Sequence, residues 1–142
     1  MILLDTNVVS EPLRQEPEPC VIEWIDAQAL ETLYLSAITV AELRTGIALL
    51  PAGDRRTKLQ ENLEKRALPL FAGRVLPFDL PCTQAYAGLM VKARETRTEL
   101  TVADGYIAAI TLANGFAVAA RAPERFEAIG VAVINPWKMK AA

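Results

Sequence analysis

Apolar residues recur along the chain with two different periods, and segments of the two kinds alternate. Short apolar runs followed by turn-forming residues predict strands at 2–4, 33–36, 75–78, 116–120 and 131–134. Apolar residues at helical spacing predict helices at about 19–30, 39–50, 54–70, 81–97 and 101–112, with shorter ones at 6–13 and 123–128. Strands that alternate with helices along the whole length predict an α/β fold with a largely parallel sheet.

This pattern predicts a single domain over residues 1–137, followed by a short C-terminal tail at 138–142. No apolar run approaches the roughly 20 residues that are needed to cross a bilayer, so we expect no contact with a membrane. The N-terminus lacks the basic and apolar regions of a signal peptide. A cytoplasmic location is therefore expected.

The chain contains no histidine among its 142 residues. This excludes nucleophiles activated by histidine, histidine general bases and most kinds of zinc site. Hydrolytic chemistry would have to rely on carboxylates, lysines or a metal. The formal net charge is −2, so binding to a nucleic acid would require local basic patches.

Three carboxylates stand out by their positions in this pattern. Asp5 directly follows the first predicted strand, where an open α/β sheet presents its ligand-binding edge. Glu42 and Asp104 each stand three residues after a threonine, Thr39 and Thr101, at the start of a predicted helix. This spacing is also that of a capping box, in which the acid binds the first backbone amide of the helix and does no chemistry. Taken singly, each acid is open to both interpretations.

Their joint arrangement favours a metal site. Two helix N-termini can face the same sheet edge as Asp5, and three acids that converge repel one another unless a cation lies between them. Oxygen ligands without histidine suit Mg²⁺ or Mn²⁺. Such an ion lowers the pKa of bound water and stabilises charge on a phosphoryl oxygen. The expected chemistry is metal-dependent hydrolysis of a phosphodiester.

Four short motifs together resemble the PIN domain, and in particular the VapC/FitB-like toxin ribonucleases of type II toxin–antitoxin pairs. They are Leu3-Leu4-Asp5-Thr6-Asn7, Thr39-Val40-Ala41-Glu42-Leu43-x-x-Gly46, Ala103-Asp104-x-x-Ile107-Ala108-Ala109 and Gly130-Val131-x-Val133-Ile134-Asn135-Pro136-Trp137. The resemblance implies a three-layer α/β/α sandwich with a central, mainly parallel sheet of four to five strands.

The resemblance also implies an activity, a cofactor and partners. Asp5, Glu42 and Asp104 match the acids that hold Mg²⁺ or Mn²⁺ for the cleavage of RNA, and Thr6 or Asn7 would orient Asp5 or the attacking water. Members usually form homodimers, and a cognate antitoxin protein neutralises them by covering the site. This chain would then be a toxin endoribonuclease.

One stretch departs from the family pattern. After the fourth strand, members usually carry Thr-Arg-Asn or Thr-Arg-Asp and a further acid before a phenylalanine. Here Ala122 replaces the fourth acidic residue and Arg125 precedes Phe126, with Glu124 as the nearest carboxylate. Arg121 and Arg125 are candidates for substrate binding, although Arg121 could be a plain surface cation and Arg125 could instead neutralise the acids.

Two alternatives therefore stand beside the active ribonuclease. The loss of the acid at Ala122 is consistent with a PIN-fold protein of weak catalysis that acts by binding an antitoxin or RNA. A phosphatase with a carboxylate nucleophile would need a second acid two residues after Asp5, and Asn7 stands there.

Overall fold

A computed structural model describes residues 1–138 and has a central sheet of five strands. The strands follow the order β3-β2-β1-β4-β5, and each pairs in parallel with its neighbours. Their bounds are β1 (Ile2–Leu4), β2 (Leu33–Ser36), β3 (Val75–Leu76), β4 (Ala117–Ala119) and β5 (Val133–Ile134). The predicted number and direction of the strands are confirmed. β3 is an edge strand and stops before Pro77, which has no N–H for a strand pair.

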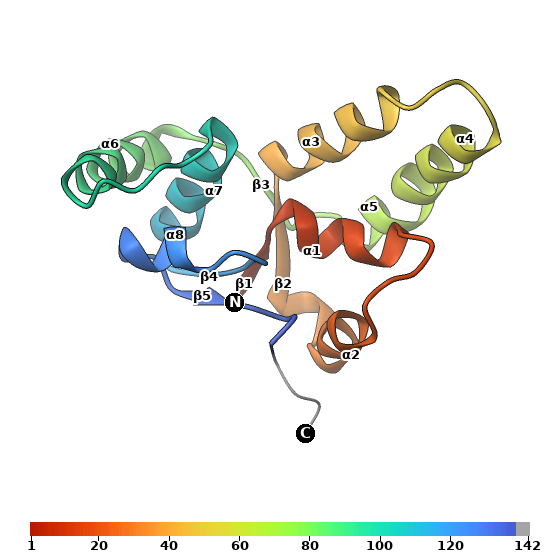
Figure 1. The fold of residues 1–142 in the computed structure, drawn as a ribbon, viewed down its shortest axis with the longest axis horizontal. Helices are drawn as coiled ribbons and strands as arrows, with labels where there is room; N and C mark the ends of the chain where they lie inside the picture. Colours follow the sequence, from red (N-terminus) through yellow and green to blue (C-terminus); the bar gives the residue numbers. More distant parts are fainter. Residues whose placement is uncertain (139–142) are drawn as a thin grey trace.

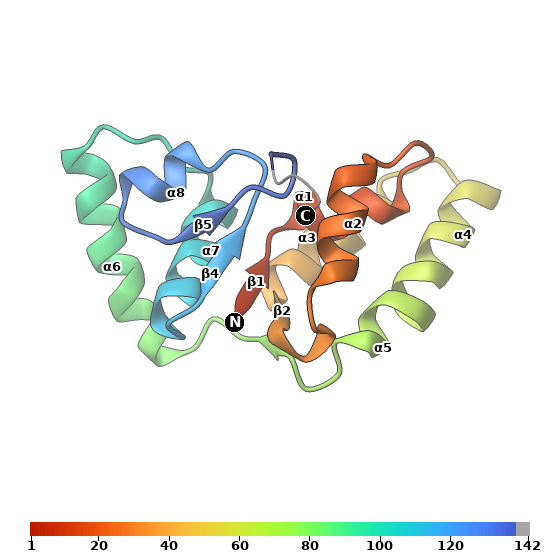
Figure 2. The same ribbon diagram turned by 90° about the horizontal axis from the view of Figure 1, so that it is seen from below.

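Helices cover both faces of the sheet and complete three layers (Figure 1). One side carries α1 (Thr6–Ser10), α2 (Pro19–Ala27), α3 (Ala37–Ala48), α4 (Asp54–Glu61) and α5 (Leu68–Leu70). The other side carries α6 (Leu80–Glu95), α7 (Val102–Ala113) and α8 (Glu124–Ala128). Between α4 and α5 the chain stays helical with π-type hydrogen bonds over Asn62–Ala67. Figure 2 shows the same two groups of helices on either side of β1.

Alternation along the strands divides the core into two clusters. Leu3 and Val118 face α6, α7 and α8, whereas the next residues, Leu4 and Ala119, face the helices of the first group. All four side chains are at most 2% exposed, and each large one stabilises the fold by about 2 kcal/mol. Two neighbouring central strands, β1 and β4, are therefore fixed from both faces, and so are the residues that follow them.

Several predicted helix bounds differ from the structure. α3 begins at Ala37, because the Ser36 hydroxyl accepts the N–H of Thr39 at 3.0 Å and takes the N-cap position predicted for Thr39. The short helix predicted at 6–13 is α1 followed by a 3-10 turn at Glu11–Leu13, and α1 is capped by the carboxylate of Asp5. The helix predicted at 19–30 ends at Ala27, and a 3-10 turn follows at Leu30–Thr32.

The last described residues close the domain behind β5. The N–H of Lys138 donates to the carbonyl of Asn135 at 3.1 Å, which makes a turn. The rest of the predicted tail, 139–142, lies outside the described residues. Within residues 1–138, no helix is both long and apolar enough to span a bilayer.

Candidate active site

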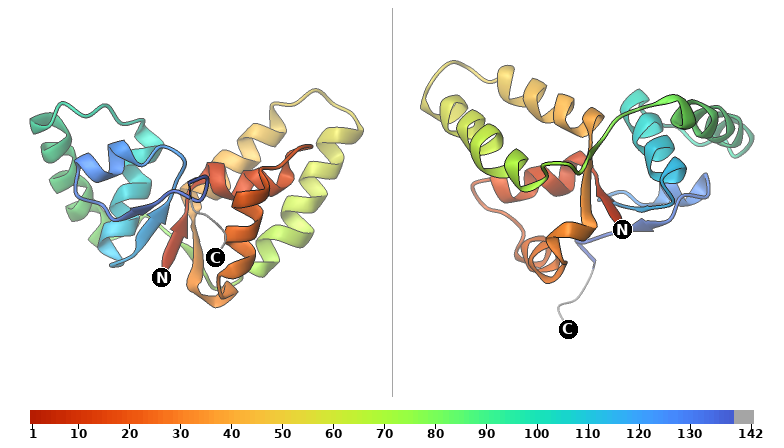
Figure 3. Two further views of the ribbon diagram at one scale, coloured as in Figure 1. Left: turned by 60° about the horizontal axis from the view of Figure 1, so that its bottom comes forward. Right: turned by 180° about the vertical axis from the view of Figure 1, so that it is seen from behind.

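The predicted acids lie where the order of the strands reverses. From β1 the chain adds β2 and β3 on one side and then crosses, through α6 and α7, to β4 and β5 on the other. Ligands of open α/β sheets bind outside the carboxyl ends of the strands at such a point. The N-terminal ends of α1 and α3 lie over the centre of this edge (Figure 3). Asp5, Glu42 and Asp104 all belong to elements that begin here.

Asp5 is held firmly at the end of β1. Its N–H donates to the carbonyl of Ala119 on β4 at 2.9 Å, and its Oδ1 accepts the N–H of Thr6 at 2.8 Å. The residue is 7% exposed. Asp5 is thus a buried carboxylate whose direction is set by the backbone on both sides of it.

Thr6 joins Asp5 to Glu42, which lies on α3. Its N–H binds Asp5, as described above, and its hydroxyl donates to Oε1 of Glu42 at 2.6 Å. The hydroxyl of Thr39 lies 3.3 Å from that of Thr6 and is fully buried. Because α3 begins two residues earlier than predicted, Glu42 lies beyond its first turn and is not part of a capping box.

Asp104 lies in the first turn of α7. The Thr101 hydroxyl accepts the N–H of Asp104 at 3.1 Å, so the predicted N-cap is confirmed. The carboxylate is directed elsewhere: its Oδ2 accepts Nη1 of Arg125, on α8, at 3.3 Å. The cap and the side-chain contact thus use different groups of Asp104, and its carboxylate is not engaged by the cap.

Two of the acids act electrostatically on the third, Asp5. The pKa of Asp5 is raised from 3.8 to about 6, chiefly because burial removes the carboxylate from water and also because of the charges of Asp104 and Glu42. The N–H of Thr6 and the guanidinium of Arg125 act in the opposite direction on this pKa. Asp5 is thus a buried acid whose ionised form is destabilised at neutral pH and would be stabilised by a cation.

This donor set suits a hard divalent ion in its chemistry. It offers carboxylate oxygens in a region of excess negative charge, with Asp5 desolvated in the middle. As the side chains lie, no three acidic, cysteine or histidine residues within 1–138 are close enough together to share one ion. Two of the acids are turned toward neighbours, Glu42 toward Thr6 and Asp104 toward Arg125. Joint ligation would therefore require side-chain movement, in which Glu42 can keep Oε1 on the Thr6 hydroxyl and offer Oε2, whereas Asp104 would leave Arg125.

Comparison with known proteins decides the family. A family model of the PIN domain matches residues 2–131. The chain belongs to the PIN domain family.

Named relatives extend over nearly the whole PIN domain. The chain is 64% identical over 138 residues to the plasmid stability protein StbB of Pseudomonas syringae pv. tomato, and 57% identical over 138 residues to the VapC ribonuclease Y4jK of Sinorhizobium fredii. It is 53% identical over 137 residues to Toxin FitB of Neisseria gonorrhoeae. These alignments cover 96–97% of this chain and 99% of each relative.

A solved structure of FitAcB from Neisseria gonorrhoeae has the same fold. It superposes with a TM-score of 0.94 at 52% identity, over 98% of this chain and 100% of that one. The predicted three-layer PIN-like architecture is confirmed.

The remaining predicted residues of this PIN domain lie around the acids in different ways. Asn7 is exposed, and within 1–138 its side chain makes no hydrogen bond. The guanidinium of Arg121 lies over the ring of Trp137, 5.2 Å from its centroid, and the Arg121 carbonyl accepts the side-chain amide of Asn135. Arg121 thus contacts the C-terminal end of the domain, whereas Arg125 contacts Asp104. Substrate binding by either arginine stays a prediction.

The departure from the family pattern has a clear structural consequence. Ala122 is exposed in the loop after β4 and offers no ligand atom. Glu124 is exposed at the start of α8, and within 1–138 it makes no side-chain hydrogen bond or ion pair. Arg125 is the charged residue of this loop and helix that contacts Asp104, one of the three acids. A cation thus occupies the neighbourhood from which the family pattern would supply a fourth acid.

Sequence patterns did not indicate two features near the site. The spacing predicts Thr39 as a helix cap and does not indicate that its buried hydroxyl lies beside Thr6. A groove of about 270 Å³ also starts at Thr6 and Glu42 and ends near Arg14 and Arg55. It is lined by Leu13, Leu43, Gly46, Ile47, Leu50 and Leu59. No sequence signal marks this groove, because its residues come from three separate helical segments.

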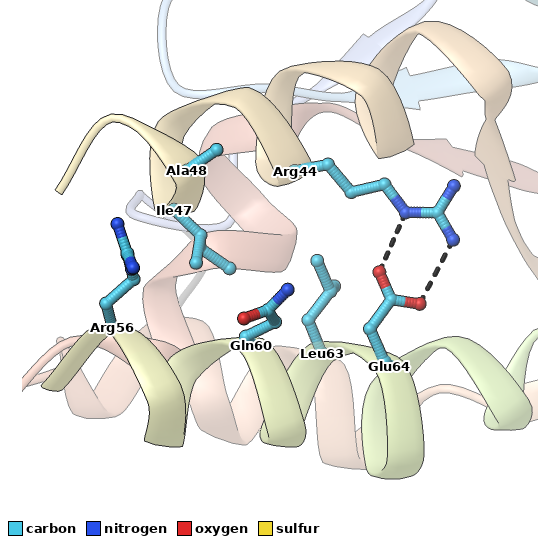
Figure 4. Close-up of a pocket in the computed structure, with 7 residues that line it drawn as sticks. All are labelled: Arg44, Ile47, Ala48, Arg56, Gln60, Leu63 and Glu64. Carbon is cyan, nitrogen blue, oxygen red and sulfur yellow. Dashed lines mark hydrogen bonds and ion pairs between the residues drawn. The ribbon is translucent and has the colours of Figure 1, made fainter. Parts of the chain in front are cut away.

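A second pocket lies away from the acids, between α3 and α4 (Figure 4). Its volume is about 350 Å³, and the ion pair between Arg44 and Glu64 closes one end, with contacts of 2.8 and 3.0 Å. The pair lowers the pKa of Glu64 through the hydrogen bond from Arg44. Both side chains are well exposed, and neither lies with the three acids, so this pocket adds no chemistry to the site.

Proposed function

We propose that this PIN domain is a divalent-metal-dependent endoribonuclease, Mg²⁺ or Mn²⁺ being the ion, and that it acts as a toxin in the cytoplasm. The supporting observation is the buried carboxylate of Asp5, whose pKa is raised to about 6 by burial and by the two acids at positions 42 and 104. The names of the relatives, a VapC ribonuclease and Toxin FitB, support the same activity and role.

Asp5, Glu42 and Asp104 would hold the ion. When bound, such an ion activates a water and stabilises charge on the scissile phosphate. Asp5 supplies a ligand fixed by the backbone of β4 and by the N–H of Thr6. The Thr6 hydroxyl fixes the direction of Glu42. Because the chain contains no histidine, a proton released from the attacking water would be accepted by these carboxylates or by solvent.

A cleavage assay tests the proposal. Purified protein should cut single-stranded RNA in the presence of Mg²⁺ or Mn²⁺, stop when EDTA is added, and lose the activity in Asp5→Asn. Glu95→Gln, which removes an exposed charge on α6, is the matched control and should cleave normally. Cleavage that is independent of metal, or that survives in Asp5→Asn, would exclude this function.

The second candidate is a PIN-fold protein with weak catalysis that acts by binding. The observation in its favour is that Ala122 provides no fourth acid while Arg125 binds Asp104. In that case metal would stimulate cleavage little, and the Asp5→Asn variant would have the same effect on growth as the unaltered protein.

The proposed partner is a cognate antitoxin that covers the site. The groove that starts at Thr6 and Glu42 supports this, because any chain that fills its apolar floor would also cover two residues of the acidic edge. Arg55, which also lines the groove, would bind acidic groups of such a segment, whereas Arg14 is paired with Glu11. A homodimer is proposed on the family resemblance alone, and light scattering of the purified protein tests it.

A further inference from the structure

Arg125 contacts the acidic site from within the chain. Its Nη1 lies 3.3 Å from Oδ2 of Asp104, and this single contact leaves the side chain of Arg125 44% exposed and that of Asp104 20% exposed. The charge of Arg125 also reaches Asp5, whose pKa it lowers. Arg125 is thus a cation that contacts Asp104 and acts on the charge of Asp5.

Apart from Arg125, the loop after β4 and the start of α8 provide no side-chain partner for the acids. Ala122 has no polar side chain, and Glu124 is exposed without a side-chain partner in residues 1–138. Thr101 binds only the N–H of Asp104, whereas Arg125, on α8, binds its carboxylate. The guanidinium therefore uses the same carboxylate that a metal at this edge would require.

A guanidinium and a divalent ion cannot both sit against the same carboxylate without strong repulsion between them. An exposed ion pair with one contact is weak and reversible, so it lowers the affinity for an ion but does not prevent its binding. The long arginine side chain can leave Asp104 by rotation while its backbone stays in α8.

We infer that Arg125 competes with the divalent ion for the carboxylate of Asp104 and thereby sets the metal concentration at which the site fills. This inference rests on the proposed function, since it concerns the same ion. Arg125 is then a regulatory residue in the segment where the family pattern would add a metal ligand. The ion binds when the Arg125 side chain moves away from Asp104, and Arg125 pairs with Asp104 again when the ion dissociates.

Calorimetric titration with Mn²⁺ alone tests the inference without any measurement of cleavage. Arg125→Gln should bind Mn²⁺ with a Kd lower by about two- to five-fold, the range that corresponds to an exposed ion pair. Arg125→Lys keeps the charge on a shorter side chain, so its Kd for Mn²⁺ should lie between those of Arg125→Gln and the unaltered chain. Arg66→Gln, an equal loss of charge from an exposed position in the other group of helices, is the control and should bind as the unaltered chain does.

The outcomes separate the inference from the proposed function. If the unaltered chain binds Mn²⁺ and Arg125→Gln binds with the same or a higher Kd, the inference is wrong and the metal site stands. If neither chain binds Mn²⁺, the proposed metal site is wrong and the inference falls with it. Melting curves in EDTA should show Arg125→Gln folded like the unaltered chain, because the side chain is exposed.

Discussion

Asp5 is buried among apolar residues, yet it must be ionised to bind a metal. Its pKa of about 6 in the fold exceeds the ordinary value of 3.8, chiefly because burial removes the carboxylate from water. Between these two pH values the folded chain binds more protons than the unfolded one. The contribution of Asp5 to stability is therefore fully present below about pH 3.8 and is lost as the pH rises through 6.

This predicts that Asp5→Asn is more stable than the unaltered chain without metal. Asparagine keeps the cap on α1 and carries no charge, so the gain at pH 7.5 should approach about 3 kcal/mol and shrink as the pH falls below 6. Urea unfolding in EDTA at several pH values measures it. Asp54→Asn, at an exposed position in α4, should change stability by less than about 0.5 kcal/mol. A destabilised Asp5→Asn at pH 7.5 would contradict this account of Asp5.

Thr6 serves two acids with two different groups, and substitution can separate them. Thr6→Val keeps the N–H that binds Asp5 and removes the hydroxyl that binds Glu42 at 2.6 Å. Residues that orient metal ligands typically contribute 10- to 100-fold, so we expect about ten-fold weaker Mn²⁺ binding in Thr6→Val. Thr6→Ser retains the hydroxyl and serves as the control. Equal Mn²⁺ affinity in the two variants would show that the Glu42 contact has no part in the site.

Sequence position alone selected the three acids but could not orient them. Asp5 could be predicted because a strand end and a turn-forming residue are local features of the sequence. The direction of Glu42 depends on a hydroxyl 36 positions away, and that of Asp104 on a guanidinium 21 positions away. Contacts at such separations follow from packing and leave no local pattern.

At the scale of the helices and strands, the centres were predictable and some ends were not. The threonine-to-acid spacing predicted caps at Thr39 and Thr101, and only Thr101 takes that role. Ser36 stands three residues before Thr39 and meets its N–H, so either hydroxyl satisfied the same rule. Packing of α3 against the sheet decides between them, which the spacing does not reveal.

The groove along α3 permits a test of the antitoxin proposal. Gly46 lies in the interior of α3, and a side chain built there meets no atom within 4 Å of its Cβ. Gly46→Leu should therefore fill the groove, weaken the antitoxin complex at least ten-fold and leave the melting temperature equal or higher. Gly88→Leu, at an equally open position in α6, should leave the affinity unchanged. Normal binding of the antitoxin to Gly46→Leu would place the partner elsewhere.

At the scale of the whole molecule, the alternation of strands and helices was sufficient to predict the layers. Right-handed crossovers are the rule for parallel strands, so few topologies were open. The order β3-β2-β1-β4-β5 places β1 at the centre and brings the segments after β1 and β2 and the start of α7 to one edge. This explains why acids that are 37 and 99 positions from Asp5 in the sequence act on its pKa.

The central claim is that Asp5, Glu42 and Asp104 form one metal site, and calorimetric titration with Mn²⁺ tests it most directly. Asp5→Asn, Glu42→Gln and Asp104→Asn should each raise the Kd at least ten-fold, because each removes a charged ligand of the same ion. The loss should be greatest for Asp5→Asn, since Asp5 is the buried and best-positioned ligand. Wild-type affinity in Asp5→Asn, or in both other variants, would contradict a shared site.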